Sequence, residues 1–237
     1  MSLDIVLVYQ SLLGIYGDQG NAMVLHKRAE WRDIDARIIR VEPGDELPVD
    51  ADLFVIGGGE DGAQTAAVKA LTEDGNLFRA VDRGAVVFGV CAGYQLLGKS
   101  FCVGADDEPR EGLGLLDVTS SRGPERAVGE ILTRWIGRSG DEAWLTGFEN
   151  HAGYTRLGAD ATPLATVEVG VGNGFDATEG AVQGNIIGTY PHGPVLARNP
   201  ALADHLLELA LGRELDQLDS PEHDILRQQR LAAVQLS

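Results

Sequence analysis

The sequence predicts an α/β fold with a mostly parallel sheet and an antiparallel extension. Over the first hundred residues, short apolar runs rich in β-branched side chains alternate with helical patterns, as in βαβ units. The runs Leu53–Ile56 and Val86–Phe88 contain no polar residues, which is typical of strands covered on both faces. From about Gly112 the chain changes to strand-like segments joined by short turns, which predict the antiparallel part.

The first six elements are expected to alternate strand and helix in a regular order. They are Ile5–Tyr9, Asn21–Trp31, Ala36–Val41, Leu53–Ile56, Ala63–Leu71 and Ala85–Val90. Right-handed crossovers place the carboxyl ends of parallel strands along one edge of a sheet. The loops at that edge are therefore expected to carry the functional site.

The later elements are expected to be short strands followed by helices. The strands are Leu115–Thr119, Ala127–Trp135, Ala143–Phe148, Leu164–Val171 and Asn185–Tyr190, and the helices are Pro200–Leu211 and Glu222–Gln235. No change in composition and no Pro/Gly/Ser linker divides the chain. We therefore expect one domain over residues 1–237, with the helices at its C-terminal end.

Composition and charge exclude several classes of protein. With 19 Lys and Arg against 36 Asp and Glu, the 237-residue chain carries a net charge of −17, whereas nucleic acids and anionic membranes attract clustered positive charge. The longest uncharged apolar stretch, Gly84–Tyr94, is far shorter than the ~20 residues of a membrane-spanning helix, and the N-terminus lacks the positive start of a signal peptide. Two cysteines are too few for a disulfide framework or a four-thiolate metal site. We expect a cytoplasmic protein without a metal.

The segment Gly89-Val90-Cys91-Ala92-Gly93 is the most specific local feature of the sequence. It follows the expected strand Ala85–Val90 and opens a helical pattern. A nucleophile on such a strand-to-helix turn projects out of the sheet, and small residues on either side relieve crowding. The helix N-terminus favours a thiolate over a thiol. Cys91 is therefore a candidate nucleophile, although an isolated cysteine is more often a buried apolar residue.

A cysteine nucleophile usually needs a base, and five histidines are available. His192 directly follows the apolar strand Asn185–Tyr190, so it is expected at the same edge as Cys91. His151 also follows an apolar run and is the alternative, although its Asn- and Gly-rich surroundings equally fit a turn that shapes a pocket. The remaining three lie in segments with a helical pattern: His26, His205 and His223. His192 is the preferred base.

Three consecutive glycines, Gly57-Gly58-Gly59, follow the strand Leu53–Ile56 at the same expected edge. Their backbone freedom allows N–H groups to converge on an anion, as in an oxyanion hole. A flexible turn is the simpler alternative. A phosphate-binding loop is disfavoured because Glu60 and Asp61 follow and no Gly-Lys-Ser/Thr is present.

The motifs in this order resemble those of the class I glutamine amidotransferases, specifically the cobyric-acid-synthase-like branch. Within that branch they are similar to the glutaminase subunits of lipid II isoglutaminyl synthases, over about residues 5–210. The motifs are YGDQGN at 16–21, GGED at 58–61, GVCAGYQ at 89–95, GFENHAGYT at 147–155 and GTYPHGP at 188–194. The resemblance implies a flavodoxin-like, three-layer fold.

The resemblance also implies a role for each matching residue. Cys91 would attack the side-chain carboxamide of L-glutamine and form a thioester, and His192 would protonate the departing ammonia. The backbone N–H groups of Gly59 and Ala92 would hold the oxyanion, and Gln95 would help to hold the substrate.

An arginine just before the strand Ala127–Trp135 is expected to bind the α-carboxylate of glutamine, because a planar guanidinium matches a carboxylate. Arg126 is preferred over Arg122 by position alone. Either arginine could equally be a solvated loop charge.

The chain departs from the common class I pattern in one place. Many members have His-x-Glu, in which the glutamate orients the imidazole, but Gly193-Pro194 follows His192 here. The orienting carboxylate must come from elsewhere. Asp18 is one candidate, and a carboxylate of a partner chain is the other and the preferred one.

The chain has no nucleotide-binding Gly-x-x-x-x-Gly-Lys-Ser/Thr segment, so the amidation is expected on another polypeptide and no cofactor is expected here. The resemblance implies a Mur-ligase-like synthetase of the MurT type as partner in a heterodimer, which amidates the D-glutamate of the lipid II stem peptide in peptidoglycan synthesis. Three alternatives stay open: another cobyric-acid-synthase-like amidation, a hydrolase of the DJ-1/PfpI type, and a non-catalytic regulatory subunit. The second is disfavoured because Ala92, rather than a histidine, follows Cys91.

Overall fold

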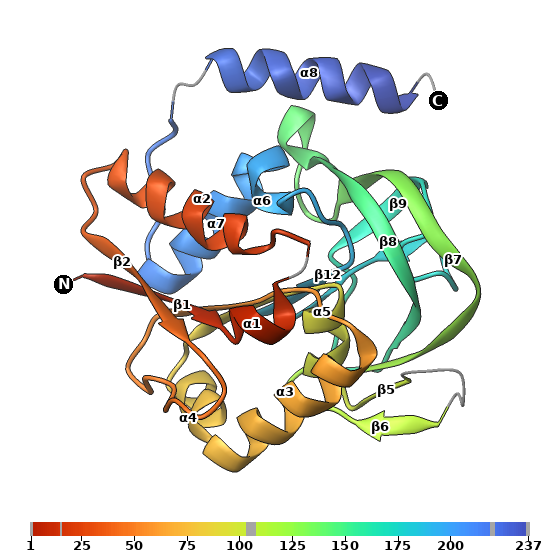
Figure 1. Cartoon of the computed structure of the whole chain (residues 1–237). Coiled ribbons are helices and arrows are strands. Elements are labelled where there is room, and N and C mark those ends of the chain that lie inside the picture. The colour runs from red at the N-terminus through yellow and green to blue at the C-terminus, as the bar shows by residue number, and fades with distance from the viewer. Residues whose placement is uncertain (1, 15, 103–107, 219–220, 236–237) are drawn as a thin grey trace.

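A six-stranded, mostly parallel sheet forms the centre of the first part of the fold (Figure 1). The computed structural model describes residues 2–14, 16–102, 108–218 and 221–235. In spatial order β11-β12-β4-β3-β1-β2, the strands are β11 (Ala181–Gln183), β12 (Ile186–Thr189), β4 (Val86–Val90), β3 (Leu53–Ile56), β1 (Leu3–Val8) and β2 (Ala36–Val41). All pairs are parallel except the edge pair of β11 with β12.

Helices cover both faces of this sheet and produce three layers (Figure 1). One face packs against α3 (Asp61–Asp74) and α4 (Asn76–Asp82), and the other packs against α2 (Gln19–Glu30) and α7 (Pro200–Leu211). Neighbouring residues of a strand point to opposite faces, so Val55 joins the core on the α2 side and Phe54 joins the core on the α3 side. The absence of polar residues in Leu53–Ile56 and Val86–Phe88 reflects this double cover, and the predicted fold class is confirmed.

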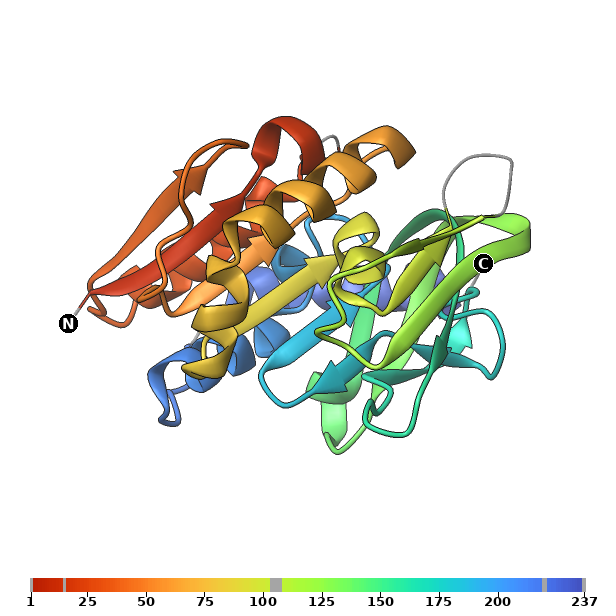
Figure 2. The ribbon, with the colours of Figure 1, turned by 90° about the horizontal axis from the view of Figure 1, so that it is seen from below.

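The later strands form a second, mostly antiparallel sheet beside the first one, in which only the pair of β5 with β7 is parallel among the described residues (Figure 2). Its order is β10-β9-β7-β5-β6, with β8 paired to β7. The strands are β5 (Ser100–Cys102), β6 (Pro109–Glu111), β7 (Val118–Trp135), β8 (Trp144–Leu157), β9 (Ala165–Val169) and β10 (Thr178–Glu179).

Two details of this region differ from the expectation. The segments expected as Leu115–Thr119 and Ala127–Trp135 belong mostly to one long strand, β7, whose pairing with β8 is irregular between Arg122 and Ala127. The segment expected as Asn185–Tyr190 is not antiparallel to the main sheet, because β12 pairs in parallel with β4. This pairing brings the residues after β12 to the carboxyl edge of β4.

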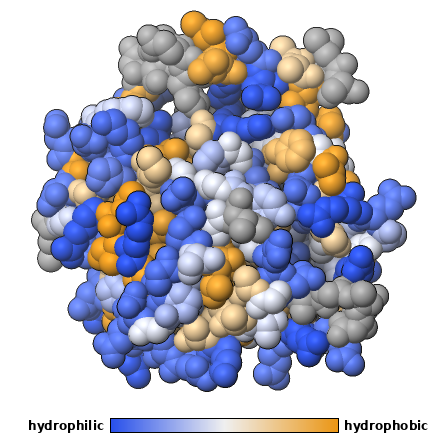
Figure 3. Space-filling view, in the orientation of Figure 1, coloured by the Kyte–Doolittle hydropathy of each residue, from blue (hydrophilic) through white to orange (hydrophobic). Residues whose placement is uncertain are grey.

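The remaining helices are short or peripheral. A 3₁₀ turn at Gly140–Ala143 precedes β8. Three short helices lie close after strands β1, β4 and β12: α1 (Gln10–Leu13), α5 (Ala92–Leu97) and α6 (Val195–Arg198). The last helix, α8 (Pro221–Gln235), lies at the periphery of the molecule (Figure 1). Among the described residues, no helix combines the length and the apolar character needed to cross a bilayer. Hydrophilic residues cover most of the face drawn in Figure 3, and apolar residues appear there as separate small patches.

Candidate active site

Cys91 lies on a strained turn between β4 and α5. Its backbone angles are φ 53° and ψ −105°, a region that non-glycine residues rarely adopt and that is common at active sites. Its N–H donates to the carbonyl oxygen of Thr189 (2.8 Å), and its own carbonyl oxygen accepts from the N–H of Gln95 (3.0 Å). The surrounding backbone therefore holds the strained conformation.

The two glycines that flank Cys91 are required by close approaches. A Cβ at Gly89 would lie 2.6 Å from a methyl group of Leu97, and a Cβ at Gly93 would clash with the carbonyl oxygen of Ile56. The N–H of Gly93 instead donates to the carbonyl oxygen of Gly57 (3.1 Å). The small residues expected on either side of the nucleophile thus let α5 pack directly against the end of β3.

His192 lies beside Cys91 with its imidazole hydrogen-bonded to Asp18. Nδ1 of His192 lies 3.2 Å from Oδ1 of Asp18, and the other oxygen of Asp18 accepts from the N–H of Gly58 (2.8 Å). Both side chains are buried. The sequence favours a partner's carboxylate at this place, but here Asp18 of the same chain bonds His192, and its second contact with Gly58 ties it to the glycine loop after β3.

The electrostatics of this group favour a charged imidazole. Burial lowers the pKa of His192, but the carboxylate of Asp18 and the sulfur of Cys91 outweigh burial and raise this pKa to about 10. Nε2 of His192 is buried and makes no hydrogen bond to any described residue. An imidazolium at this position stabilises a thiolate on Cys91.

A cavity of about 420 Å³ opens in front of Cys91, where the two sheets meet. Three expected site residues, Gly59, Cys91 and Gln95, and both candidate arginines line this cavity, whereas His192, Asp18 and Ala92 are not among the lining residues. The lining includes Tyr16, Gly59, Cys91, Gln95, Cys102, Arg122, Arg126, Asn150 and His151. The second cysteine thus borders the same cavity as the first.

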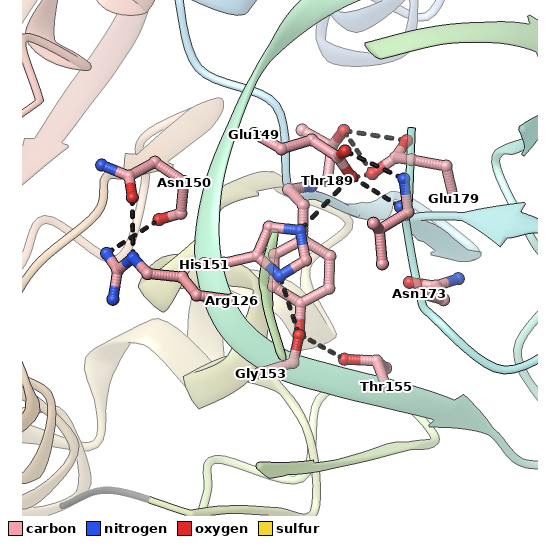
Figure 4. Close-up of polar contacts among 12 residues, drawn as sticks. Arg126, Glu149, Asn150, His151, Gly153, Thr155, Asn173, Glu179 and Thr189 are labelled. Carbon is pink, nitrogen blue, oxygen red and sulfur yellow. Dashed lines mark hydrogen bonds and ion pairs between the residues drawn. The ribbon is translucent and has the colours of Figure 1, made fainter. Parts of the chain in front are cut away.

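The substrate-binding residues expected from the sequence, Gln95 and Arg126, both line this cavity. Nε2 of Gln95 donates to the hydroxyl of Tyr190 (3.3 Å). Arg126 on β7 donates through Nε to Oδ1 of Asn150 (2.9 Å) and through Nη2 to the carbonyl oxygen of Asn150 (3.4 Å), as Figure 4 shows. Arg122 lines the same wall, so the preference for Arg126 stays a prediction.

His151 forms part of the cavity wall and is not paired with Cys91. Its Nδ1 lies 2.8 Å from the carbonyl oxygen of Gly153, and its Nε2 lies 3.4 Å from Oε1 of Glu149 (Figure 4). The ring stacks on Tyr190 with centroids 3.8 Å apart. Both ring nitrogens are engaged, which supports His192 as the base and the pocket-shaping alternative for His151.

Sequence reasoning missed two residues that contact the site. The ring of Tyr16 lies 4.6 Å from the imidazole of His192, and Asn150 holds the guanidinium of Arg126. Both lie inside motifs that carried the family resemblance, so the motifs pointed to them without indicating their contacts. His26 on α2 and His205 on α7 are not among the residues that line the cavity, and the side chain of His223 lies outside the part of the chain that the structure describes.

Comparisons with known proteins agree with this geometry. Subunit GatD of a lipid II isoglutaminyl synthase (glutamine-hydrolyzing) from Staphylococcus aureus is 36% identical over 205 residues, which cover 85% of this chain and 82% of that protein. The corresponding subunit GatD from Streptococcus pneumoniae is 32% identical over 235 residues, 97% of this chain and 89% of that protein. A solved glutamine amidotransferase structure with 26% identity matches 86% of this chain and 98% of its own, with a TM-score of 0.59. The profile of the CobB/CobQ-like glutamine amidotransferase domain matches residues 4–200, and because this match spans both sheets and the cysteine turn, the chain belongs to that family.

Proposed function

We propose that this chain is the glutaminase subunit of a lipid II isoglutaminyl synthase. It would hydrolyse L-glutamine to glutamate and ammonia and deliver the ammonia to a Mur-ligase-like, ATP-dependent partner. That partner would amidate the D-glutamate of the lipid II stem peptide, a step of cell-wall peptidoglycan synthesis that maintains cell shape. The likeness to GatD over most of both chains supports this acceptor, and we place the heterodimer in the cytoplasm, where ATP is available.

The observation that carries the hydrolytic part is Cys91 on its strained turn beside the His192–Asp18 pair. The thiolate of Cys91 would attack the Cδ carbonyl carbon of glutamine, and the backbone N–H groups of Gly59 and Ala92 would stabilise the oxyanion that forms. Collapse of this intermediate breaks the C–N bond, and His192 donates its proton to the leaving nitrogen. A thioester on Cys91 and one molecule of ammonia result.

Water then completes the cycle. His192, now neutral, takes a proton from water as the resulting hydroxide adds to the thioester carbonyl. The C–S bond breaks, glutamate leaves, and the imidazolium–thiolate pair is restored. Asp18 orients the imidazole throughout and stabilises its positive charge, as a carboxylate does in comparable triads.

The substrate would lie along the cavity with its carboxamide at Cys91. A planar guanidinium suits the α-carboxylate, and both Arg126 and Arg122 border the cavity. Gln95 also borders the cavity and would bond the polar part of the substrate. The volume of about 420 Å³ accommodates an amino acid of this size.

The test is co-purification with the Mur-ligase-like protein of the same organism, followed by assays of glutamine hydrolysis and lipid II amidation. We expect a stable heterodimer that amidates lipid II only with ATP and glutamine, and a glutaminase kcat that is higher in the complex than in the chain alone. Glutamine hydrolysis without amidation of lipid II would overturn the assigned acceptor. Absence of hydrolysis in both the chain and the complex would overturn the proposal.

A further inference from the structure

Glu179 on β10 is a buried carboxylate that the reaction above does not use. It is 1% exposed. The hydroxyl of Thr189 lies 3.0 and 3.1 Å from its two oxygens, and the N–H of Tyr190 donates to Oε1 at 2.8 Å. Figure 4 shows Glu179 and Thr189 side by side, joined by dashed lines. A buried carboxylate is costly unless it is hydrogen-bonded, so these bonds fix the two residues at the end of β12.

The end of β12 is bonded to Cys91 and leads along the chain to His192. The carbonyl oxygen of Thr189 accepts from the N–H of Cys91 (2.8 Å), which directly supports the strained turn. Two residues after Tyr190, His192 is paired through its backbone with Phe148 (2.9 and 3.1 Å). The backbone from 189 to 192 thus connects the anchor at Glu179 to the thiol on one side and to the imidazole on the other.

The side chain of Tyr190 extends this arrangement into the cavity. Its hydroxyl accepts from Nε2 of Gln95 (3.3 Å) and shares a hydrogen bond with Oγ1 of Thr155 (2.7 Å). Its ring stacks on His151, which lines the cavity. A shift of the Tyr190 backbone would therefore displace a binding residue and the cavity wall together.

We infer that Glu179 is a positioning residue for glutamine hydrolysis: its carboxylate holds Thr189 and Tyr190 so that Cys91 and His192 keep their working geometry. Glu179 is not among the residues that line the cavity and acts only through these neighbours. The inference rests on the proposed roles of Cys91 and His192. No sequence motif indicated it, because Glu179 lies outside the five motifs that carry the resemblance.

The ionisation of Glu179 predicts how kcat should depend on pH if Glu179 has this role. Burial and the nearby Glu149 raise its pKa to about 7, although its bonds from Tyr190 and Thr189 lower it. The titratable groups that face it are Glu149 on β8, Tyr94 on α5 and Tyr190 after β12. As the pH falls through 7, Glu179 gains a proton and accepts the N–H of Tyr190 less strongly, so kcat should decrease.

The test compares Glu179→Gln and Glu179→Ala with wild type in the full chain bound to its partner. Glu168→Gln is the matched control, because Glu168 is an exposed glutamate on the neighbouring strand β9. For each protein, kcat and KM for glutamine are measured from pH 5.5 to 9. The rate at which iodoacetamide alkylates Cys91 is measured over the same range and does not depend on glutamine turnover.

We expect Glu179→Gln to lower kcat about 10-fold with KM changed by less than about twofold, because one charge-assisted hydrogen bond is weakened. Its profiles should lack the decline below pH 7. Glu179→Ala should lower kcat about 100-fold, the scale of a small misplacement of reacting groups. Glu168→Gln should match wild type in both parameters.

The other possible results show whether the role of Glu179 or the proposed glutaminase function is wrong. Wild-type kcat in Glu179→Gln, or a decline below pH 7 that persists in this variant, would overturn the inference. If Glu179→Ala fails to fold in a thermal unfolding scan, the isosteric Glu179→Gln decides alone. If wild type does not hydrolyse glutamine, the proposed function fails, and the alkylation profile of Cys91 still decides whether Glu179 positions the thiol.

Discussion

At the scale of single residues, two cysteines border one cavity but occupy different backbone environments. Cys91 has a positive φ at the N-terminus of α5, whereas Cys102 ends a strand of the second sheet. Cys91 lies beside His192 at the N-terminus of α5, whereas Cys102 lies on β5. Reactivity should therefore differ between them even though both are near the cavity.

We expect Cys91→Ser to fold and to lose glutamine hydrolysis, because a hydroxyl at this place has no comparably acidic proton. Cys102→Ser is the control and should retain kcat within about twofold, because no step of the proposed reaction uses the thiol of Cys102. A diazoketone analogue of glutamine should label Cys91 alone, which peptide mass spectrometry can verify. Labelling of Cys102 would show that the nucleophile is misassigned.

Asp18→Asn should lower both the pKa of His192 and the rate of hydrolysis. The carboxylate helps to raise this pKa to about 10, so its removal shifts the pKa downward and leaves the imidazole neutral at a lower pH. We expect kcat to fall about 100-fold, the scale of losing acid–base catalysis. The checks are an NMR pH titration of the His192 ring and glutaminase kinetics, with the exposed Asp82→Asn as control. An unchanged kcat in the complex would support a partner's carboxylate, the preference from the sequence.

At the scale of elements, the turn between β4 and α5 depends on how closely the helix approaches β3. The N–H of Gly93 donates to the carbonyl oxygen of Gly57, and no side chain separates α5 from the end of β3. The same contact places the glycine loop 57–59 next to Cys91. The close contact between Gly93 and Gly57 thus brings the proposed oxyanion donors next to Cys91.

Gly93→Ala should lower the free energy of unfolding by about 1–3 kcal/mol, the usual cost of forcing extra volume into a packed site. Its new Cβ would clash with the backbone oxygen of Ile56, which no rotamer change relieves. Gly62→Ala on α3 is the control, since open space surrounds its Cβ position and alanine favours a helix. Urea unfolding of both variants is the measurement, and equal stability of Gly93→Ala and wild type would contradict this account.

At the scale of the whole molecule, residues from both sheets line the cavity. Cys91 and Gly59 follow strands of the first sheet, whereas Arg122 and Arg126 lie on β7 of the second. The first sheet therefore supplies the proposed chemistry, and the second supplies the positive charges for the substrate carboxylate. Binding and catalysis should respond separately to substitutions in the two sheets.

Arg126→Ala should raise KM for glutamine about 10-fold or more with kcat changed little, because a contact made equally in ground and transition states is lost. Arg122→Ala is the matched comparison on the same strand. Steady-state kinetics with glutamine provide both parameters. A raised KM in the Arg122 variant beside an unchanged Arg126 variant would show that the other arginine binds the substrate.

The sequence by itself determined the parallel α/β sheet, the turn at Cys91 and the preference for His192, because these depend on local patterns and on the rule that parallel strands end at one edge. Only the tertiary structure decided that Asp18 bonds His192 across 174 positions, that the later strands form a separate sheet, and that Glu179 anchors the end of β12. The physical reason is that the hydrogen-bond partners of a buried carboxylate, like the neighbours of a strand, are set by how separate segments of the chain pack together. The local sequence pattern does not predict which of these segments come into contact.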